Sequence, residues 1–360
     1  MPSWDRDLVL GLRSLRQNPV LSLTAVLTLT LGIGANTAIF TLLYGLVLRS
    51  LPVHDAPGLV KVGIASAAEP NQEDASFMPY RMFQALRAEQ SSFSDLSAWA
   101  ADQVLIKDEQ GAVHGYIAAL VGGNAFQLMG LQPHRGRLIA PGDDVRGGPP
   151  SGWPVVLSYG FWRDFYGDGP DLIGKQIKIS EVTVTVVGIT PPDFQGIWPG
   201  NEPKMYLPAQ FESVLAKKDV LDEPDSLFGC SVIGRLKPGL RITQANAEMS
   251  QLQKDLLTRF VPLRFQHDDF FIKAYLVVSS ARSGLPSYVT HTYGRPLYLM
   301  QGLVSVVLLL CCINVGGLMM SRVAARQQEF ALRSAVDASS LRLVRQYLTE
   351  SFVIAIAAAA

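Results

Sequence analysis

Two long stretches without a charged side chain constrain this chain more than any other feature. No Asp, Glu, Lys or Arg occurs over the 32 residues from Gln17 to Leu48, or over the 25 residues from Leu297 to Ser321. A helix needs about 20 consecutive apolar residues to cross the hydrocarbon core of a bilayer. We therefore expect two membrane-spanning helices, at 17–48 and 296–321.

A secretory signal peptide is the alternative for the first stretch. Its apolar region normally covers about 7–15 residues and ends in a small-residue cleavage site. The first stretch is about twice as long and continues through Ala38 and Leu48 without such a site, which favours a retained span. A third apolar run starts at Ser351, and we expect 351–360 to be the beginning of a third span in a longer protein.

Arginines next to the two stretches predict the orientation of the chain. Three arginines precede the first stretch, five follow the second between Arg322 and Arg345, and only Arg49 follows the first before Lys61. Basic residues close to the ends of a span are enriched on the cytoplasmic side. The expected layout is cytoplasmic for 1–16 and 322–350, and extracytoplasmic for 49–295.

The composition of the outer segment limits what it can bind. Between Ser50 and Arg295 there are 22 Lys and Arg against 26 Asp and Glu. Such a mildly acidic segment lacks the basic field that attracts nucleic acid, so no nucleic-acid partner is expected. Cys230 is its only cysteine, and no disulfide can form within it.

Strand-like and helix-like runs alternate in the outer segment, which predicts an α+β domain inserted between the first and second spans. The clearest helix is expected from about Thr243, as its cap, to Phe260. A second helix is expected from near Ser76, with Pro79 in its first turn. Runs with the β-branched content of strands occur at 59–65, 113–121, 154–158, 182–189 and 230–236. Segments rich in Gly and Pro, expected to be loops that separate two subdomains, occur at 135–154 and 194–204.

No catalytic or metal-binding constellation emerges from the sequence, and no cofactor is expected. The segment Gly169–Gln176, "GPDLIGKQ", fits the start of a phosphate-binding loop but has Gln176 where Ser or Thr should follow the lysine. The residues after it are strand-like, so we expect a turn leading into a hairpin. The "HDD" at His267–Asp269 could hold a cation weakly, but an exposed polar turn is the commoner role of such a cluster.

The expected inner segment after the second span is basic. Five of the 29 residues from Arg322 to Glu350 are arginines. The pattern predicts a helix, a turn near Asp337 and a second helix that enters the membrane. The arginines either fix the topology and contact anionic lipid, or the first helix docks on a cytoplasmic protein.

A family resemblance favours docking. "NPVLSLTAVLTLTLGIGANTAIFTLLYGLVLRSLP", "VVLSYGFWRDFYGDGPDLIGKQIKI" and "EFALRSAVDASSLRLVRQYLTES" resemble bacterial ABC-transporter permeases of the MacB/FtsX type, particularly the orphan permeases with duplicated halves. The resemblance implies a multi-pass protein of the bacterial inner membrane, a dimer or pseudo-dimer, and a separate cytoplasmic ATPase subunit. That ATPase would drive movements of the outer domain (mechanotransmission) and so the export or efflux of an outer substrate or partner.

The resemblance also implies which residues contact the ATPase. The family's coupling element corresponds to about Glu329 to Ala338, although the family usually has glycine where Asp337 stands. The alternative function is a non-transporting scaffold or sensor whose outer domain binds a ligand or protein. The residues expected to contact the ATPase are Glu329, Phe330, Leu332, Arg333, Val336 and Asp337.

Small residues in the first span predict a helix-packing face. Gly32, Gly34 and Ala38 lie in "GIGANTA", and Gly34 with Ala38 forms a small-xxx-small pair. Such pairs let two helix backbones approach closely, although lipid-facing flexibility is the alternative.

Overall fold

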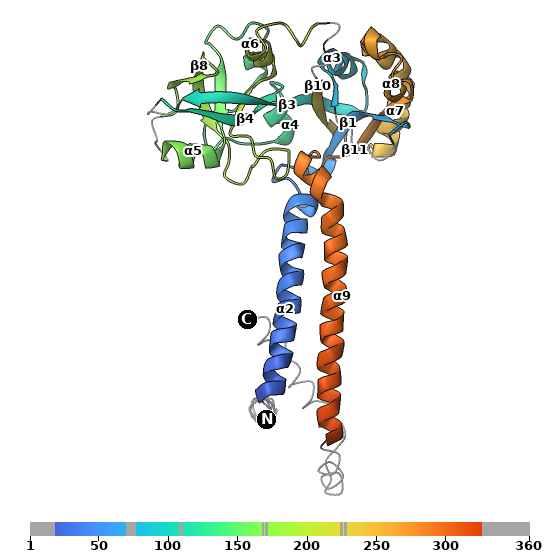
Figure 1. Ribbon diagram of the computed structural model, residues 1–360. Coiled ribbons are helices and arrows are strands. Elements are labelled where there is room, and N and C mark those ends of the chain that lie inside the picture. Colours follow the sequence, from blue (N-terminus) through green and yellow to red (C-terminus); the bar gives the residue numbers. More distant parts are fainter. Residues whose placement is uncertain are drawn as a thin grey trace. The chain divides into compact units, whose positions relative to one another are not determined.

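The computed structural model describes residues 19–69, 77–107, 111–167, 169, 172–223, 226 and 229–325. Contacts divide the chain into two compact units (Figure 1). One unit holds two long apolar helices. The other, Val47–His291, is an α+β domain that we call the outer domain.

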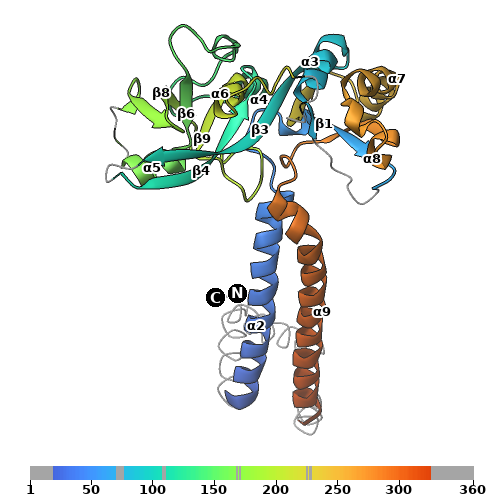
Figure 2. The same ribbon diagram turned by 45° about the horizontal axis from the view of Figure 1, so that its top comes forward.

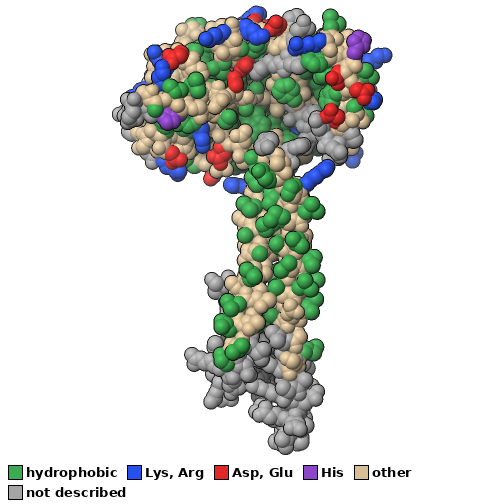
Figure 3. Space-filling view, viewed as in Figure 1, with side chains coloured by type: hydrophobic (Ala, Val, Ile, Leu, Met, Phe, Trp, Pro, Cys, Tyr) green, Lys and Arg blue, Asp and Glu red, His purple; other side chains and the backbone are tan. Residues whose placement is uncertain are grey.

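Two helices of the first unit are long and apolar enough to cross a membrane, over Leu23–Leu48 and Thr292–Gly317. The first consists of α2 (Pro19–Leu43) and a single π-helical turn, η1 (Tyr44–Leu48), and the second lies within α9 (Tyr288–Ala325). Figure 3 shows hydrophobic side chains along the described length of both. A helix that exposes apolar side chains all round requires an apolar solvent, which a bilayer provides. The helix α9 begins before the span expected at 296–321 and accommodates Pro296 in its interior.

The outer domain is built on one 11-stranded mixed sheet in the order β11-β1-β10-β3-β4-β9-β6-β8-β5, with β2 paired to β10 and β7 paired to β8. Most neighbours are antiparallel, while β4 with β9 and β6 with β8 are parallel. The strands are β1 (Leu59–Ser66), β2 (Phe77–Pro79), β3 (Phe93–Lys107), β4 (Val113–Val121), β5 (Arg135–Gly136), β6 (Pro154–Leu157), β7 (Gln176–Ile179), β8 (Val182–Ile189), β9 (Met205–Pro208), β10 (Gly229–Leu236) and β11 (Ala274–Ser280).

The strand β3 runs through all three hydrophobic clusters of the outer domain. Its first residues, among them Phe93, pack in a cluster with α3 (Tyr80–Glu89) and α7 (Ile242–Phe260). Trp99 is fully buried in the central cluster. Val104 and Ile106 belong to a third cluster, which α5 (Tyr159–Tyr166) covers.

Helices cover the two ends of the sheet. Figures 1 and 2 place α3, α7 and α8 (Asp269–Ile272) at the end formed by β1 and β11, and α5 at the other end. The edge strand β11 is satisfied by α7, because the Asn246 amide donates to the carbonyl oxygen of Val278 at 2.9 Å and its oxygen accepts from the Val278 N–H at 2.8 Å. These two bonds block strand pairing at Val278 on this edge. Two further short helices are α4 (Ala125–Met129) and α6 (Glu212–Leu215).

Both helix starts expected from the sequence need correction. The helix α7 begins at Ile242, and the Gln244 side chain accepts the N–H of Arg241 at 2.9 Å, so Thr243 is inside the helix and not its cap. The helix α3 begins at Tyr80 rather than near Ser76. Pro79 precedes it in an extended conformation, since Phe77–Pro79 pairs with β10 as a strand.

The five predicted strands are present, and the hairpin expected after "GPDLIGKQ" is confirmed, since β7 pairs antiparallel with β8. The segments expected to separate two subdomains instead join strands of a single sheet. The "HDD" carboxylates have local roles. Asp268 caps α8 by accepting the N–H of Phe270 at 2.8 Å, and Asp269 pairs with Lys273 at 2.9 Å.

Candidate functional site

The residues expected to contact an ATPase, from Glu329 to Asp337, lie outside the described part of the chain, as do 351–360. The predicted packing residues of α2 are described. Gly32 is buried, and a Cβ built on it would lie 3.1 Å from Leu308 Cδ1. Gly34 and Ala38 are exposed, and a Cβ on Gly34 would meet nothing within 4 Å. Packing of the Gly34 and Ala38 pair against a further helix therefore stays a prediction.

A stripe of small and apolar residues joins α2 to α9. Ala25 and Leu29 are buried, and Cys311 and Val315 of α9 pack against them. Together with Gly32 these buried positions follow one another at intervals of four and three residues. This spacing is typical of left-handed helix pairs.

A polar contact continues the stripe inside the apolar segments. The Gln301 side-chain amide donates to Asn36 Oδ1 at 2.7 Å, and the Ser305 hydroxyl approaches the same oxygen at 3.3 Å. The Gln301 Oε1 is buried without a hydrogen-bond partner among the described residues. Polar side chains in a membrane span commonly mark function. The sequence gives one sign of this contact, the amide side chains of Asn36 and Gln301 in otherwise apolar runs. The contact itself was not predicted from the sequence.

The chain enters and leaves the outer domain at hydrogen-bonded neighbours. The N–H of Leu51 donates to the carbonyl oxygen of Arg282 at 2.8 Å, and the Arg282 guanidinium donates to the Ser50 hydroxyl at 2.7 Å. The N–H of Ala281 donates to the carbonyl oxygen of Leu59 at 3.0 Å. The two connections to the apolar helices are therefore tied together within the domain itself.

Arg235, at the end of β10, fixes the entering segment to the sheet. Its guanidinium donates to the carbonyl oxygens of His54 at 2.7 Å, Asp55 at 3.0 Å and Leu128 at 3.1 Å, and to the Asp55 carboxylate at 2.8 Å. The planar fork of arginine suits several acceptors held at once. We call this arrangement, Arg235 with His54, Asp55 and Leu128, the Arg235 clamp. In the sequence, Arg235 is a single arginine in a strand-like run, and this pattern does not indicate that its side chain binds the entering segment.

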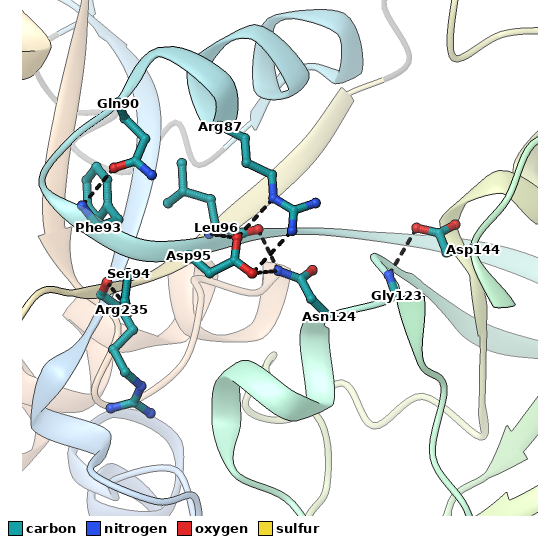
Figure 4. Close-up of polar contacts among 10 residues, drawn as sticks. All are labelled: Arg87, Gln90, Phe93, Ser94, Asp95, Leu96, Gly123, Asn124, Asp144 and Arg235. Atoms are coloured by element: carbon teal, nitrogen blue, oxygen red, sulfur yellow. Dashed lines mark hydrogen bonds and ion pairs between the residues drawn. The ribbon is translucent and has the colours of Figure 1, made fainter. Parts of the chain in front are cut away.

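A second polar junction holds the start of β3 (Figure 4). Arg87 of α3 forms a forked pair with Asp95, at 2.9 and 3.2 Å. Asn124, just before α4, donates to Asp95 at 2.6 Å and to the carbonyl oxygen of Leu96 at 2.9 Å. Asn124 is buried, so these bonds are shielded from water. The junction ties α3 and α4 to the same strand.

Asp144 links the adjacent loops to this region. Its carboxylate accepts the N–H of Gly123 at 3.0 Å and the N–H of Gln210 at 2.9 Å (Figure 4 shows the Gly123 bond). Burial raises the pKa of Asp144, and the backbone hydrogen bonds oppose this rise. A carboxylate with two backbone donors has a structural role here.

The contacts described above hold segments of the chain together. Among the described residues, no group of three or more His, Cys, Asp or Glu side chains could hold a metal ion. The described arrangements instead join segments: α2 to α9, the entry of the outer domain to its exit, and α3 and α4 to β3.

Comparisons with known proteins agree with this architecture. The family model described as the MacB-like periplasmic core domain matches residues 22–252. The "Macrolide export ATP-binding/permease protein MacB" of Aggregatibacter actinomycetemcomitans is 24% identical over 238 residues, which cover 65% of this chain and 32% of the relative. The protein of the same name from Burkholderia thailandensis is 24% identical over 235 residues, with the same two coverages. The chain spans about a third of the length of these curated relatives.

Two solved structures are also similar. The periplasmic region of MacB from Actinobacillus actinomycetemcomitans has a TM-score of 0.44 and 13% identity, and covers 63% of this chain and 90% of that one. The extracellular domain of the ABC-type transporter YknZ from Gram-positive bacteria has a TM-score of 0.41 and 13% identity, and covers 55% and 93%.

The fold class expected from the sequence is confirmed: two apolar helices flank an α+β domain of the extracytoplasmic kind in a membrane protein. The residues matched by the family model make up more than half of the chain. The chain therefore belongs to the family of proteins with a MacB-like periplasmic core domain.

Proposed function

We propose that this chain is the permease subunit of an ABC transporter of the MacB/FtsX type. A separate cytoplasmic ATPase would bind the segment around Glu329 to Asp337, and the two spans would carry its movement to the outer domain. The result would be export or efflux of a substrate, or action on an outer partner. Residues 1–16 and 322–350 would lie in the cytoplasm, at the inner membrane of a bacterium.

The observation that best supports this proposal is the junction where the chain enters and leaves the outer domain. Ser50 and Leu51 are bonded to Arg282, and the Arg235 clamp fixes the next residues to the sheet. A displacement of either connection must therefore be passed to the sheet instead of being absorbed by a slack linker. Such a connection suits mechanical transmission.

The contact between α2 and α9 supports the same function. A hydrogen bond in an apolar solvent has no water to compete with it, so the Gln301 to Asn36 bond favours joint movement of the two helices. A dimer or pseudo-dimer would offer the exposed Gly34 and Ala38 a second packing surface.

A test of the ATPase contact is copurification of the protein from native membranes. We expect an ATPase subunit to copurify with the wild-type protein and to be lost with Leu332→Asp or Arg333→Glu. Arg49→Glu is the matched control, since it reverses a charge beside the first span on the expected outer side. Retention of the ATPase by both coupling variants would refute the docking assignment.

The alternative, a sensor or scaffold, is favoured by a cleft in the outer domain whose lining includes Asp102, Trp198 and Glu212. A sensor would retain its outer ligand but copurify with no ATPase. The same experiment therefore distinguishes the two functions.

A further inference from the structure

The strand β3 has one edge that is only partly paired. On its first edge, β4 pairs with it from Trp99 to Lys107. On its second edge, β10 pairs with it only from Phe93 to Trp99, where Trp99 faces Ser231. Figure 1 shows β3 continuing beyond β10 beside β4. Within the described part of the chain, the residues after Trp99 therefore have a paired strand on the β4 edge alone.

The contacts of Leu105 show which backbone groups point to the second edge. Its carbonyl oxygen accepts the N–H of Ser180 at 2.8 Å, and its N–H donates to the Ser180 hydroxyl at 3.2 Å, so both groups of Leu105 point away from β4. Successive residues of a strand direct their N–H and C=O groups to alternate edges. The backbone groups of Ala101 and Gln103 therefore point to the same edge as those of Leu105. Both residues are exposed.

The open part of this edge is short and bounded at both ends. Pairing with β10 ends at Trp99, and Ser180 occupies the edge at Leu105. Between them, the Gln103 N–H donates to its neighbour Asp102 at 2.7 Å, which leaves the N–H and C=O of Ala101 and the C=O of Gln103. The six steps from Trp99 to Leu105 cover about 20 Å, enough for a partner strand of about four or five residues.

The open edge borders a cleft of about 510 Å³ in the outer domain. The lining includes Ala100, Ala101 and Asp102 of β3, and Gly229 and Ser231 of β10. The cleft thus lies where β10 parts from β3. Its volume is in the range of about 300–1,000 Å³ that is usual for binding sites. The backbone of β3 is therefore accessible from a space that can hold a ligand.

The other lining residues indicate which side chains would fit. The Phe77 ring lies where a Cβ on Gly229 would be, and Phe77 is 55% exposed. Trp198 adds a second aromatic side chain to the lining. Asp102 and Glu212 also line the cleft, and its described lining contains no Lys, Arg or His. The cleft therefore favours apolar side chains and disfavours acidic ones.

The edge of β11 shows how this domain blocks strand pairing elsewhere. There, Asn246 of α7 bonds to both backbone groups of Val278. Open strand edges readily pair with other chains, which is why proteins normally cover them. An exposed edge at Ala101 that borders a cleft is therefore suited to a partner strand.

We propose that an extended segment of an outer protein partner adds to β3 as a strand at Ala101 and Gln103. The Ala101 N–H would donate to a carbonyl oxygen of the segment, and the Ala101 carbonyl oxygen would accept an N–H from it. Phe77 and Trp198 would pack against its apolar side chains. In strand addition the main-chain bonds supply affinity and the alternate side chains supply specificity. The segment would be rich in β-branched residues and free of acidic ones.

This inference deepens the proposed function, on which it rests for the role of the partner. Its test needs no ATPase, so the two can fail separately. The full chain in detergent is titrated by calorimetry with acetyl-Thr-Val-Thr-Val-Thr-amide. One matched peptide has the same side chains but N-methyl groups on its second and third residues, which block both of its edges. Another has Glu in place of the central Thr.

The methylated peptide separates strand addition from binding through side chains alone. We expect it to bind at least about tenfold more weakly than the unmethylated peptide, because it lacks main-chain donors. The glutamate peptide should also bind more weakly, because its charge repels the acidic side chains of the lining.

Proline substitutions test the edge itself. Ala101→Pro removes an N–H that points away from β4, so it should change the melting temperature little and weaken the unmethylated peptide by about tenfold. Ala100→Pro is the matched control, because the Ala100 N–H points to β4. This control should lower the melting temperature by at least about 5 °C.

An apolar pair of variants tests the wall of the cleft. Phe77→Ala should weaken the unmethylated peptide by about fivefold. Leu263→Ala is its control, since Leu263 is 75% exposed and lies outside the cleft lining. This control should leave the affinity unchanged.

The peptide comparison on the wild-type chain decides the proposal even if Ala101→Pro does not fold. No binding of the unmethylated peptide, equal affinity for the methylated peptide, equal affinity for the glutamate peptide, or unchanged affinity in a folded Ala101→Pro variant would each overturn it. Chemical crosslinking between copies tests for another occupant. Crosslinks that disappear in Ala101→Pro would place a second copy of this chain at the edge and would also overturn the proposal.

Discussion

Gln301 of α9 donates a hydrogen bond to Asn36 of α2 across 2.7 Å, within two segments that are otherwise apolar. Asn36 Oδ1 also lies 3.3 Å from the Ser305 hydroxyl. Because both residues face the neighbouring helix, the bond fixes the register of α2 against α9.

We predict that Asn36→Leu and Gln301→Leu are energetically coupled. Each variant removes the same interhelical bond. The double variant should therefore lower the free energy of unfolding by less than the sum of the two single variants. The expected coupling is about 0.6 kcal/mol, and up to about 2 kcal/mol. Unfolding of the full chain by SDS titration in mixed micelles measures it. Ser250→Ala, an exposed change in the outer domain, should show no coupling with Gln301→Leu.

A second prediction concerns the Arg235 clamp. Arg235 is 19% exposed at its side chain, while Asp55 is 55% exposed, so the ion pair itself contributes less than about 1 kcal/mol. The bonds to the carbonyl oxygens of His54 and Leu128 should contribute more. We expect Arg235→Lys to lower the free energy of unfolding by about 2 kcal/mol, because an ammonium group cannot reach every acceptor.

The matched control for Arg235→Lys is Asp55→Asn. Asp55 has a positive φ of 46°, which asparagine also tolerates, so the backbone is not strained by the change. Thermal unfolding followed by circular dichroism should show a much smaller loss for Asp55→Asn. An equal loss in the two variants would mean that the ion pair, not the carbonyl contacts, stabilises the clamp.

A third prediction follows from the raised pKa of Glu212, about 7 against an ordinary value of 4.5. The folded chain holds this proton more tightly than the unfolded chain does. The contribution of Glu212 to stability is therefore present at low pH and is lost as the pH rises from about 4.5 to about 7. Burial is the main cause of the raised pKa of Glu212, and the negative charge of Asp102 raises it further.

Glu212→Gln removes this titration and isolates it from other acids such as Asp144. The melting temperature of the variant relative to wild type should increase across the same pH range. Melting curves at several pH values in one buffer series measure the difference. A constant difference between the two proteins at every pH would contradict the assignment.

A fourth prediction separates two glycines of α2. A side chain at Gly32 meets Leu308 and Cys311, whereas nothing lies within 4 Å of a Cβ at Gly34. Gly32→Leu should therefore disrupt the α2 and α9 contact and lower stability by about 1–3 kcal/mol, as overpacking does. Gly34→Leu should leave the stability of the single chain unchanged.

Gly34→Leu also tests the proposed dimer. If Gly34 and Ala38 pack against a helix of another copy, this variant should reduce chemical crosslinking between copies in membranes. Crosslinking that is unaffected by Gly34→Leu would place the pair against lipid.

The sequence predicted those features whose physical signal is local. Charge-free runs longer than a bilayer crossing identify α2 and α9, and β-branched runs such as Val182–Ile189 identify strands. The strand β3 was not predicted, because "FSDLSAWAADQV" mixes Ser, Asp and Ala and lacks a β-branched signal at its start. Its conformation depends on pairing with β10 and β4, and β10 is distant in sequence.

The candidate sites were harder to predict for the same reason. The Arg235 clamp joins residues up to 181 positions apart, and Asn36 is 265 positions from Gln301. Glu212 follows Phe211 in an ordinary helical run, and only the packing around it leaves its carboxylate buried. The predicted coupling residues from Glu329 to Asp337 stay a prediction.

The 15 residues of β3 give the outer domain one continuous backbone element common to three clusters. Unfolding any one cluster would remove packing from a strand that also belongs to the other two clusters. Partial unfolding of the domain is therefore unfavourable. Amide hydrogens near Phe93 and near Ile106, about 40 Å apart along an extended strand, should exchange with solvent at a common slow rate. The three clusters would then unfold as one cooperative unit and not one after another.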